Sequence, residues 1–121
     1  MAESRPQIER FASDLIEYVR DPAIDTLWTR ISPSADGPSA RRWREAGASR
    51  ESEAMLRTVI PDVVDSTLFR LLDAIDNGRL RLIAVQDGEP IDLTEAGMAE
   101  MAGEYIGGEW RRRYSKQPVF G

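Results

Sequence analysis

The sequence predicts a mostly α (α+β) fold, a single domain of about five to six helices with one two-stranded antiparallel β-hairpin at residues 80–93. Apolar residues recur at helical spacing along most of the chain. Asp87-Gly88 stands between two strand-like runs, which is the signal of a two-residue hairpin turn. A length of 121 residues fits one domain, 1–121.

Residues 7–31 predict an N-terminal helical hairpin. The first helix, residues 7–20, carries an apolar stripe of Ile8, Phe11, Ala12, Leu15, Ile16 and Val19. Asp21 suits the N-cap of a second helix and Pro22 its first position. The second stripe consists of Ile24, Leu27, Trp28 and Ile31. Together the two helices are expected to form half of the core.

Residues 32–39 have the composition of a loop. A short helix is expected at 39–47, where Gly47 ends it. Another helix is expected at 50–60, with Ser49 as its cap. Its inward-facing residues would be Met55, Leu56, Val59 and Ile60.

The central helix is expected to begin at Pro61 and to end before Gly78, which suits the residue after a helix. Its apolar face consists of Val64, Leu68, Leu71, Leu72 and Ile75. A second stripe, within about 80° on the helix, consists of Asp62, Asp65, Phe69, Asp73 and Asp76. We interpret this acidic stripe either as a solvated outer face or as a partner-binding surface with one aromatic anchor.

The hairpin and the next helix complete a helix–hairpin–helix unit at 61–106. A two-residue turn pairs Val85 with Pro90 and Ala84 with Ile91. The face expected to cover the helices consists of Leu82, Ala84, Ile91 and Leu93. Asp92 or Thr94 can cap a helix over 94–107. Its apolar side consists of Met98, Met101, Ala102, Tyr105 and Ile106.

Residues 110–121 form a basic aromatic tail. We expect Trp110 and Tyr114 to pack back on the domain, since aromatic residues make a disordered tail less favourable. The arginines would then face the acidic residues or a partner. The candidate anion-binding residues are Arg41, Arg42, Trp43, Arg44, Arg111, Arg112 and Arg113. For Trp43 the alternative is a place in the core, with its neighbouring arginines solvated or paired.

Charge is distributed unevenly along the chain, whose net charge is −5. Residues 60–109 hold eleven acidic and three basic residues, a balance of −8. Residues 110–121 have a balance of +4, and residues 39–58 a balance of +2. These segments can form ion pairs within the chain, or they can present two surfaces of opposite sign.

The composition excludes several kinds of catalytic and metal-binding site. The chain has neither cysteine nor histidine, which excludes disulfides, thiolate metal sites and a Ser-His-Asp triad. The sequence indicates no cofactor and no metal site, and whether the protein is an enzyme stays undecided. No run has the apolar length of a membrane span, and the first ten residues lack the apolar core of a signal peptide. We therefore expect a bacterial cytoplasmic protein without a membrane partner.

Two resemblances bear on function. The central helix, the Asp-Gly hairpin and the LTEAG start of the next helix are similar to the recognition helix, wing and following helix of winged-helix regulators. This resemblance implies DNA binding, but the helix carries four aspartates and one arginine, which phosphates would repel. The residues VIPDVVDSTLFRLLDAIDNG, LTEAG and GEYIGGEWRRRYSKQ of the C-terminal half also resemble small bacterial proteins of the domain-of-unknown-function type.

The leading hypothesis is a non-catalytic binding or regulatory protein whose acidic stripe engages a basic protein partner, as an immunity protein engages a toxin. One alternative is a Mg²⁺-dependent phosphohydrolase, in which Asp62 and Asp65 face Glu100 and Glu104. Another is the winged-helix-like regulator. A homodimer through the hairpin edge or the tail is also left open.

Overall fold

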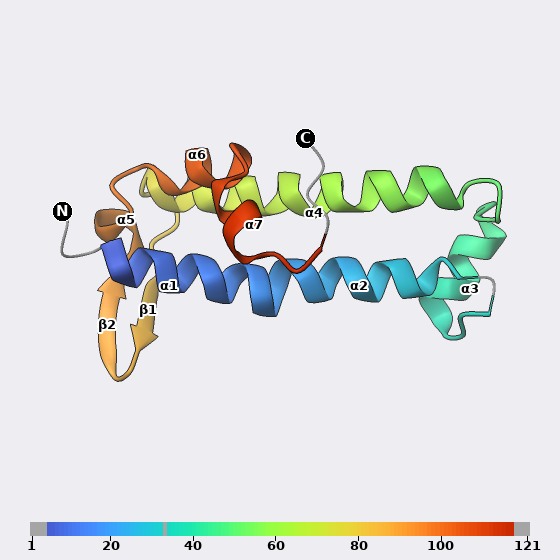
Figure 1. The fold of residues 1–121 in the computed structure, drawn as a ribbon, viewed down its shortest axis with the longest axis horizontal. Coiled ribbons are helices and arrows are strands. Elements are labelled where there is room, and N and C mark those ends of the chain that lie inside the picture. Colours follow the sequence, from blue (N-terminus) through green and yellow to red (C-terminus); the bar gives the residue numbers. More distant parts are fainter. Residues whose placement is uncertain (1–4, 33, 118–121) are drawn as a thin grey trace.

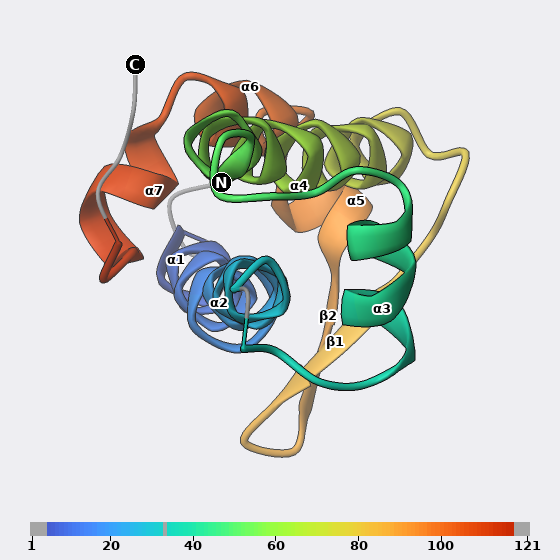
Figure 2. The same cartoon turned by 90° about the vertical axis from the view of Figure 1, so that its right-hand side faces the viewer.

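The computed structural model, which describes residues 5–32 and 34–117, confirms the predicted fold class (Figure 1). Two long helical segments lie side by side and antiparallel, as Figure 2 shows along their length. One contains α1 (Arg5–Leu15) and α2 (Asp21–Arg30), and the other is α4 (Glu53–Asp76). The short α3 (Pro38–Glu45) joins them at one end. Residues 118–121 of the predicted tail lie outside the described residues.

The predicted N-terminal helical hairpin is wrong, because the chain continues from α1 into α2 as one rod (Figure 1). A π-helical turn, η2 (Ile16–Arg20), joins the two helices. Asp21 is not an N-cap: it has helical dihedral angles, and its N–H donates to the carbonyl of Ile16. The wider π turn changes which side chains face inward. Val19 is exposed, whereas Arg20 is buried.

The two helices predicted at 50–60 and 61–77 form one helix, α4, with Pro61 in its interior. A proline has no N–H, so the carbonyl four residues earlier, that of Arg57, loses its helical partner. The indole Nε1 of Trp28 on α2 donates to this carbonyl at 3.2 Å. The guanidinium of Arg57 also lies over the Trp28 ring, 5.8 Å from its centroid. Tertiary packing therefore satisfies the group that Pro61 leaves without a partner.

The core lies between the rods and under the C-terminal helices. It confirms the expected apolar faces of α1 and α4 in large part, with Ile8, Ala12, Leu15, Ile16, Leu68, Leu72 and Ile75 buried. The N-terminal half of α4 departs from expectation: of the four residues expected to face inward only Ile60 is buried, and Met55 and Val59 are exposed.

The hairpin has the predicted register. Strand β1 (Ile83–Gln86) pairs with β2 (Glu89–Asp92), so that Ala84 lies opposite Ile91 and Val85 opposite Pro90. Both turn residues, Asp87 and Gly88, have positive φ, as a type I′ turn requires. Ile91 and Leu93 are buried and Ala84 packs on the core, but Leu82 is exposed.

The single helix expected over 94–107 is divided into α5 (Leu93–Ala96) and α6 (Met101–Ile106), followed by α7 (Glu109–Tyr114). As expected, the Asp92 carboxylate caps α5 by accepting from two backbone N–H groups. The division falls at Met98 and Ala99, whose φ angles of +53° and +59° are left-handed. Such angles cost about 1–2 kcal/mol per non-glycine residue, so contacts of α6 must outweigh them.

Within residues 5–32 and 34–117, no helix combines the length and apolar character needed to cross a bilayer. This agrees with the absence of a membrane-length apolar run in the sequence.

The Trp28–Arg57 hydrogen bond gives a test of the Pro61 arrangement. Trp28→Phe should lower the free energy of unfolding by about 1 kcal/mol, because it removes the donor to the Arg57 carbonyl. In a Pro61→Ala background the restored Ala N–H serves that carbonyl, so the same change should cost less. Urea unfolding of the four proteins of this double-mutant cycle measures the difference. An equal cost in both backgrounds would show that the indole does not replace the missing helical bond.

Candidate functional site

The residues of the predicted acidic stripe do not form one exposed surface. Asp65 is only 5% exposed, and Phe69 packs partly against the core. The cause is α6, which packs on α4 and contacts Asp65 through Tyr105 and Asp76 through the Ala102 N–H. Asp62 stays fully on the outside and Asp73 partly so. The expectation that these five residues share an exposed face is therefore wrong, and a binding role for Asp62 and Asp73 stays a prediction.

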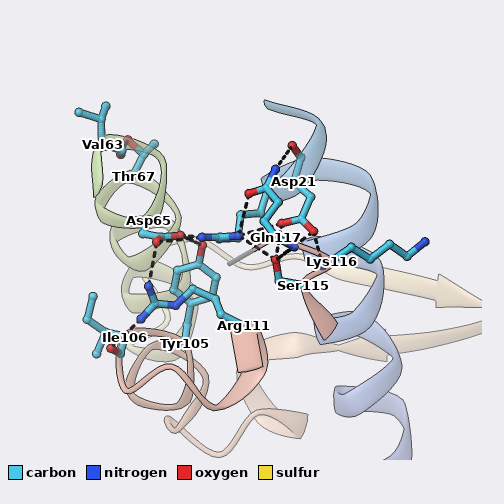
Figure 3. Close-up of polar contacts among 11 residues, drawn as sticks. Asp21, Val63, Asp65, Thr67, Tyr105, Ile106, Arg111, Ser115, Lys116 and Gln117 are labelled. Carbon is cyan, nitrogen blue, oxygen red and sulfur yellow. Dashed lines mark hydrogen bonds and ion pairs between the residues drawn. The ribbon is translucent and has the colours of Figure 1, made fainter. Parts of the chain in front are cut away.

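Asp65 is the centre of a buried polar cluster, shown in Figure 3. Arg20 donates to its Oδ1 from Nε at 2.8 Å, and Arg111 donates to Oδ2 from Nη1 at 2.8 Å. The hydroxyl of Tyr105 donates to Oδ1 at 2.6 Å. One carboxylate thus joins α4 to η2, α6 and α7.

Arg20 extends the cluster to the end of the described chain. Its Nη1 donates to Asp21 at 2.8 Å and to the Ser115 hydroxyl at 3.1 Å. Asp21 in turn accepts from the Ser115 hydroxyl and from the Lys116 backbone N–H (Figure 3). Two buried cations, Arg20 and Arg111, are thereby balanced by two buried anions, Asp65 and Asp21. This pairing matters because an unpaired buried charge costs several kcal/mol.

The surroundings shift the pKa values of this cluster in opposite directions. Burial raises the pKa of Asp65, but the hydrogen bonds from Arg20 and Tyr105 and the charge of Arg111 outweigh it, so the net pKa lies below the ordinary value of 3.8. Burial and the neighbouring Asp65 carboxylate raise the pKa of Tyr105 above its ordinary value of 10.0. Near neutral pH Asp65 is therefore ionised and Tyr105 is protonated.

Asp76 has a different structural role. Its Oδ2 accepts from the backbone N–H of Ala102 at 2.8 Å, so a side chain of α4 caps the first turn of α6. Burial raises the pKa of Asp76, and the charges of Asp73 and Glu100 act in the same direction against the backbone N–H groups. This cap and the Asp65 cluster account for the close packing of α6 on α4.

The seven candidate anion-binding residues lie at two separate places. Arg111 is buried against Asp65, Arg112 pairs with Glu109, and Arg113 pairs with Glu9. These pairs confirm that the basic tail meets acidic residues of the same chain. Trp110 is buried and Tyr114 packs on the core, as expected. Arg41, Arg42 and Arg44 lie on α3, at the far end of the molecule (Figure 1).

The arginines of α3 keep their charge available. All three are exposed, and within the described residues none has a carboxylate in ion-pair contact. Arg42 donates to the hydroxyl of Ser39, and Arg44 to the carbonyl of Ala35. Arg50, in the turn before α4, is likewise exposed and outside the ion pairs of the described chain.

A groove lies beside these arginines, between α3 and the start of α4. Its volume is about 360 Å³. The apolar residues that line it are Trp43, Ala46, Ala48, Met55, Leu56 and Ile60. Trp43 is half-buried there, so it occupies neither the core nor a fully exposed stacking position. On α4 the apolar surface continues at helical spacing through Val59 and Val63, both exposed.

The two alternative functions, a Mg²⁺-dependent phosphohydrolase and a winged-helix-like regulator, are not supported by a comparable site in the described residues. In the described part of the chain, no group of three or more acidic side chains is arranged to hold a metal ion. Asp65, one of the proposed ligands, is occupied by two arginines and a tyrosine. The helix that resembles a recognition helix, α4, packs against α2 and α6 and does not stand free for a DNA groove.

Sequence reasoning missed Arg20, Tyr105 and Ser115 as members of the buried cluster. A signal for Arg20 was present, since it lies at the middle of the i, i+4, i+8 series between Ile16 and Ile24 on an apolar stripe. A charged residue at an inward position indicates a buried partner. Apart from the adjacent Asp21, the partners Asp65 and Ser115 lie 45 and 95 residues away, so no local pattern could identify them.

Replacing Asp65 should strongly destabilise the fold. Asp65→Asn removes the charge but keeps the size, leaving Arg20 and Arg111 as buried cations without their common anion. We expect the free energy of unfolding to fall by about 3–5 kcal/mol. Asp62→Asn, on the exposed side of the same helix, should change it by less than about 0.5 kcal/mol. Urea unfolding checks both, and equal effects would contradict the central role of Asp65.

The same cluster predicts a stability that depends on pH at both extremes. The folded-state pKa of Asp65 lies below its unfolded value of about 3.9, so its contribution is present above that pH and is lost on acidification through the folded pKa. The folded-state pKa of Tyr105 lies above about 10, so stability falls as pH rises beyond 10. Unfolding free energies from about pH 3 to 11 measure both limbs. Tyr105→Phe should flatten the alkaline limb, and an unchanged limb would contradict the assignment.

No protein-family model, curated protein or solved structure gave a significant match to the chain.

Proposed function

We propose that the chain is a non-catalytic binding protein whose partner-binding surface is the groove between α3 and the start of α4. The observation that supports this is an apolar groove whose neighbouring arginines, Arg41, Arg42 and Arg44, have no carboxylate partner in the described chain. Exposed apolar surface surrounded by polar residues is typical of protein interaction sites.

The shape of the apolar surface favours a helical partner. Met55, 60% exposed, is followed at i+4 and i+8 by Val59 and Val63. These residues form one stripe on α4, since side chains four apart lie on the same face of a helix. A groove with such a stripe fits the apolar face of an amphipathic helix, a common mode of peptide recognition.

The charge of the site favours an acidic partner. The tail arginines are occupied within the chain, whereas those of α3 are free to pair with carboxylates of another molecule. Opposite charge at the rim of an interface selects the partner and speeds association. Of the predicted acidic stripe, a basic partner would find only Asp62 and Asp73 on the outer side of α4, about 16 Å apart along the axis.

Asp65 offers no comparable support for catalysis. Its carboxylate is buried and is held by three hydrogen-bond donors, so a substrate has no access to it. The cluster therefore supports a role in holding the helices together.

A library of displayed amphipathic helical peptides, selected on the full chain, tests this proposal. Selected peptides should bind the groove, and Met55→Asp should weaken them at least about tenfold because it places a charge on the apolar surface. Met98→Asp is the matched control, since Met98 is 56% exposed and stands between α5 and α6, which lie at the opposite end of the molecule from α3 (Figure 1). The Trp43 fluorescence should change on binding, and the loss of this change in Trp43→Phe would assign the signal to Trp43.

The charge of the selected peptides tests the nature of the partner. They should carry a net negative charge, bind more weakly at high salt, and lose affinity with the double variant Arg41→Glu, Arg42→Glu. If the affinity of the peptides depends on Met55 but not on these arginines, the proposal of an acidic partner is contradicted, whereas that of the groove as binding surface is not. Failure to recover any Met55-dependent peptide would contradict the groove as a binding surface.

A further inference from the structure

Strand β1 has an edge without the usual protection. Natural sheets guard free edges with charges, prolines or bulges, since an open edge can pair with another chain. The β2 strand has such residues in Glu89, Pro90 and Asp92. The β1 sequence IAVQ has neither a charge nor a proline. Two of its side chains, Ile83 and Val85, are 57% and 68% exposed.

The backbone of β1 also has groups available for pairing. The N–H of Leu93 donates to the carbonyl of Leu82 at 3.1 Å. Bonded and non-bonded residue pairs alternate along an antiparallel ladder, so the next bonded pair is Ala84 with Ile91. The N–H and C=O groups of Ile83 and Val85 therefore point away from β2. No loop or helix of the described chain supplies them with a partner.

We propose that β1 is the interface of a homodimer, in which the β1 strands of two copies pair antiparallel and form a four-stranded sheet. Antiparallel pairing of two identical strands has two-fold symmetry, as a closed dimer requires. In the register proposed here, Ile83 lies opposite Val85 of the second copy. The outward-facing groups of both residues are then satisfied, and four exposed apolar side chains meet on one face.

The charges near β1 suit a second copy of the same chain. In this register Arg81 lies opposite Asp87 of the second copy, and symmetry repeats the pair. Within one copy Arg81 contacts Asp92, and Asp87 contacts Arg10 at 2.6 Å. Both side chains remain more than half exposed. The edge therefore brings together opposite charges at both ends of an uncharged centre.

The hairpin projects from the rest of the domain, so a second copy of the chain can approach it. It extends past α1 on the side away from α4 and α6, as Figures 1 and 2 both show. The strand is short, so the interface is at the small end of the known range, below about 1,200 Å², where complexes are weak or transient. We expect a dimer that forms at micromolar to millimolar concentration.

Sedimentation equilibrium of the full chain between about 10 μM and 1 mM tests for this dimer. Val85→Lys should raise the dissociation constant at least about tenfold, because it places a charge at the centre of the paired edge. Val19→Lys is the matched control, with the same charge change at a valine of η2 that is 47% exposed and belongs to neither proposed surface. A monomer over the whole range, or equal effects of the two variants, would overturn the proposal.

Two further measurements distinguish strand pairing from other contacts. The amide hydrogens of Ile83 and Val85 should exchange more slowly as concentration rises, because only the dimer gives them acceptors; exchange independent of concentration would overturn the proposal. Arg81→Glu and Asp87→Lys should each weaken the dimer about three- to tenfold, and the double variant should restore it. Equal weakening by the single and double variants would overturn the proposed register.

Discussion

The buried carboxylate of Asp65 is the interaction on which the arrangement of the helices depends. It accepts hydrogen bonds from side chains of three other elements, η2, α6 and α7. Two cations and two anions balance in a region almost without solvent. A buried ion pair contributes little net stability compared with apolar packing, but removing one partner is costly. Its physical effect is therefore to disfavour arrangements in which the C-terminal helices are displaced from α4.

The π turn between α1 and α2 is a part of the same arrangement. In this turn Val19, a member of the predicted apolar stripe, is exposed, and Arg20 is buried. The unfavourable geometry of a π turn persists only where other contacts stabilise it. Here the contacts are the hydrogen bonds from Arg20 to Asp65 and Asp21. Pro61 in α4 is a similar case, because Trp28 provides the partner that the helix lacks.

Internal pairing also decides which charges are left for other molecules. The basic C-terminal segment is bound to Asp65, Glu9 and Glu109, so its excess positive charge is used within the chain. The arginines of α3 have no such partners in the described residues, and they lie beside exposed apolar surface. The two surfaces proposed for contacts, the α3–α4 groove and the β1 edge, share one property. Each combines uncovered apolar side chains with polar groups that the described residues leave available: arginines without a carboxylate partner at the groove, and outward-facing backbone N–H and C=O groups at β1.

The sequence by itself determined the fold class, the hairpin with its register, and most of the apolar faces. Each of these follows from contacts between residues that are near in sequence: helical spacing, the Asp87-Gly88 turn, and the Asp92 cap. Only the tertiary structure decided that Asp65 is buried while Asp62 is exposed, that residues 5–30 form one rod, and that α5 and α6 are separate helices. The reason is physical. Burial of a charge, a π turn and a left-handed break are each unfavourable locally, and they occur because partners distant in the sequence compensate for them.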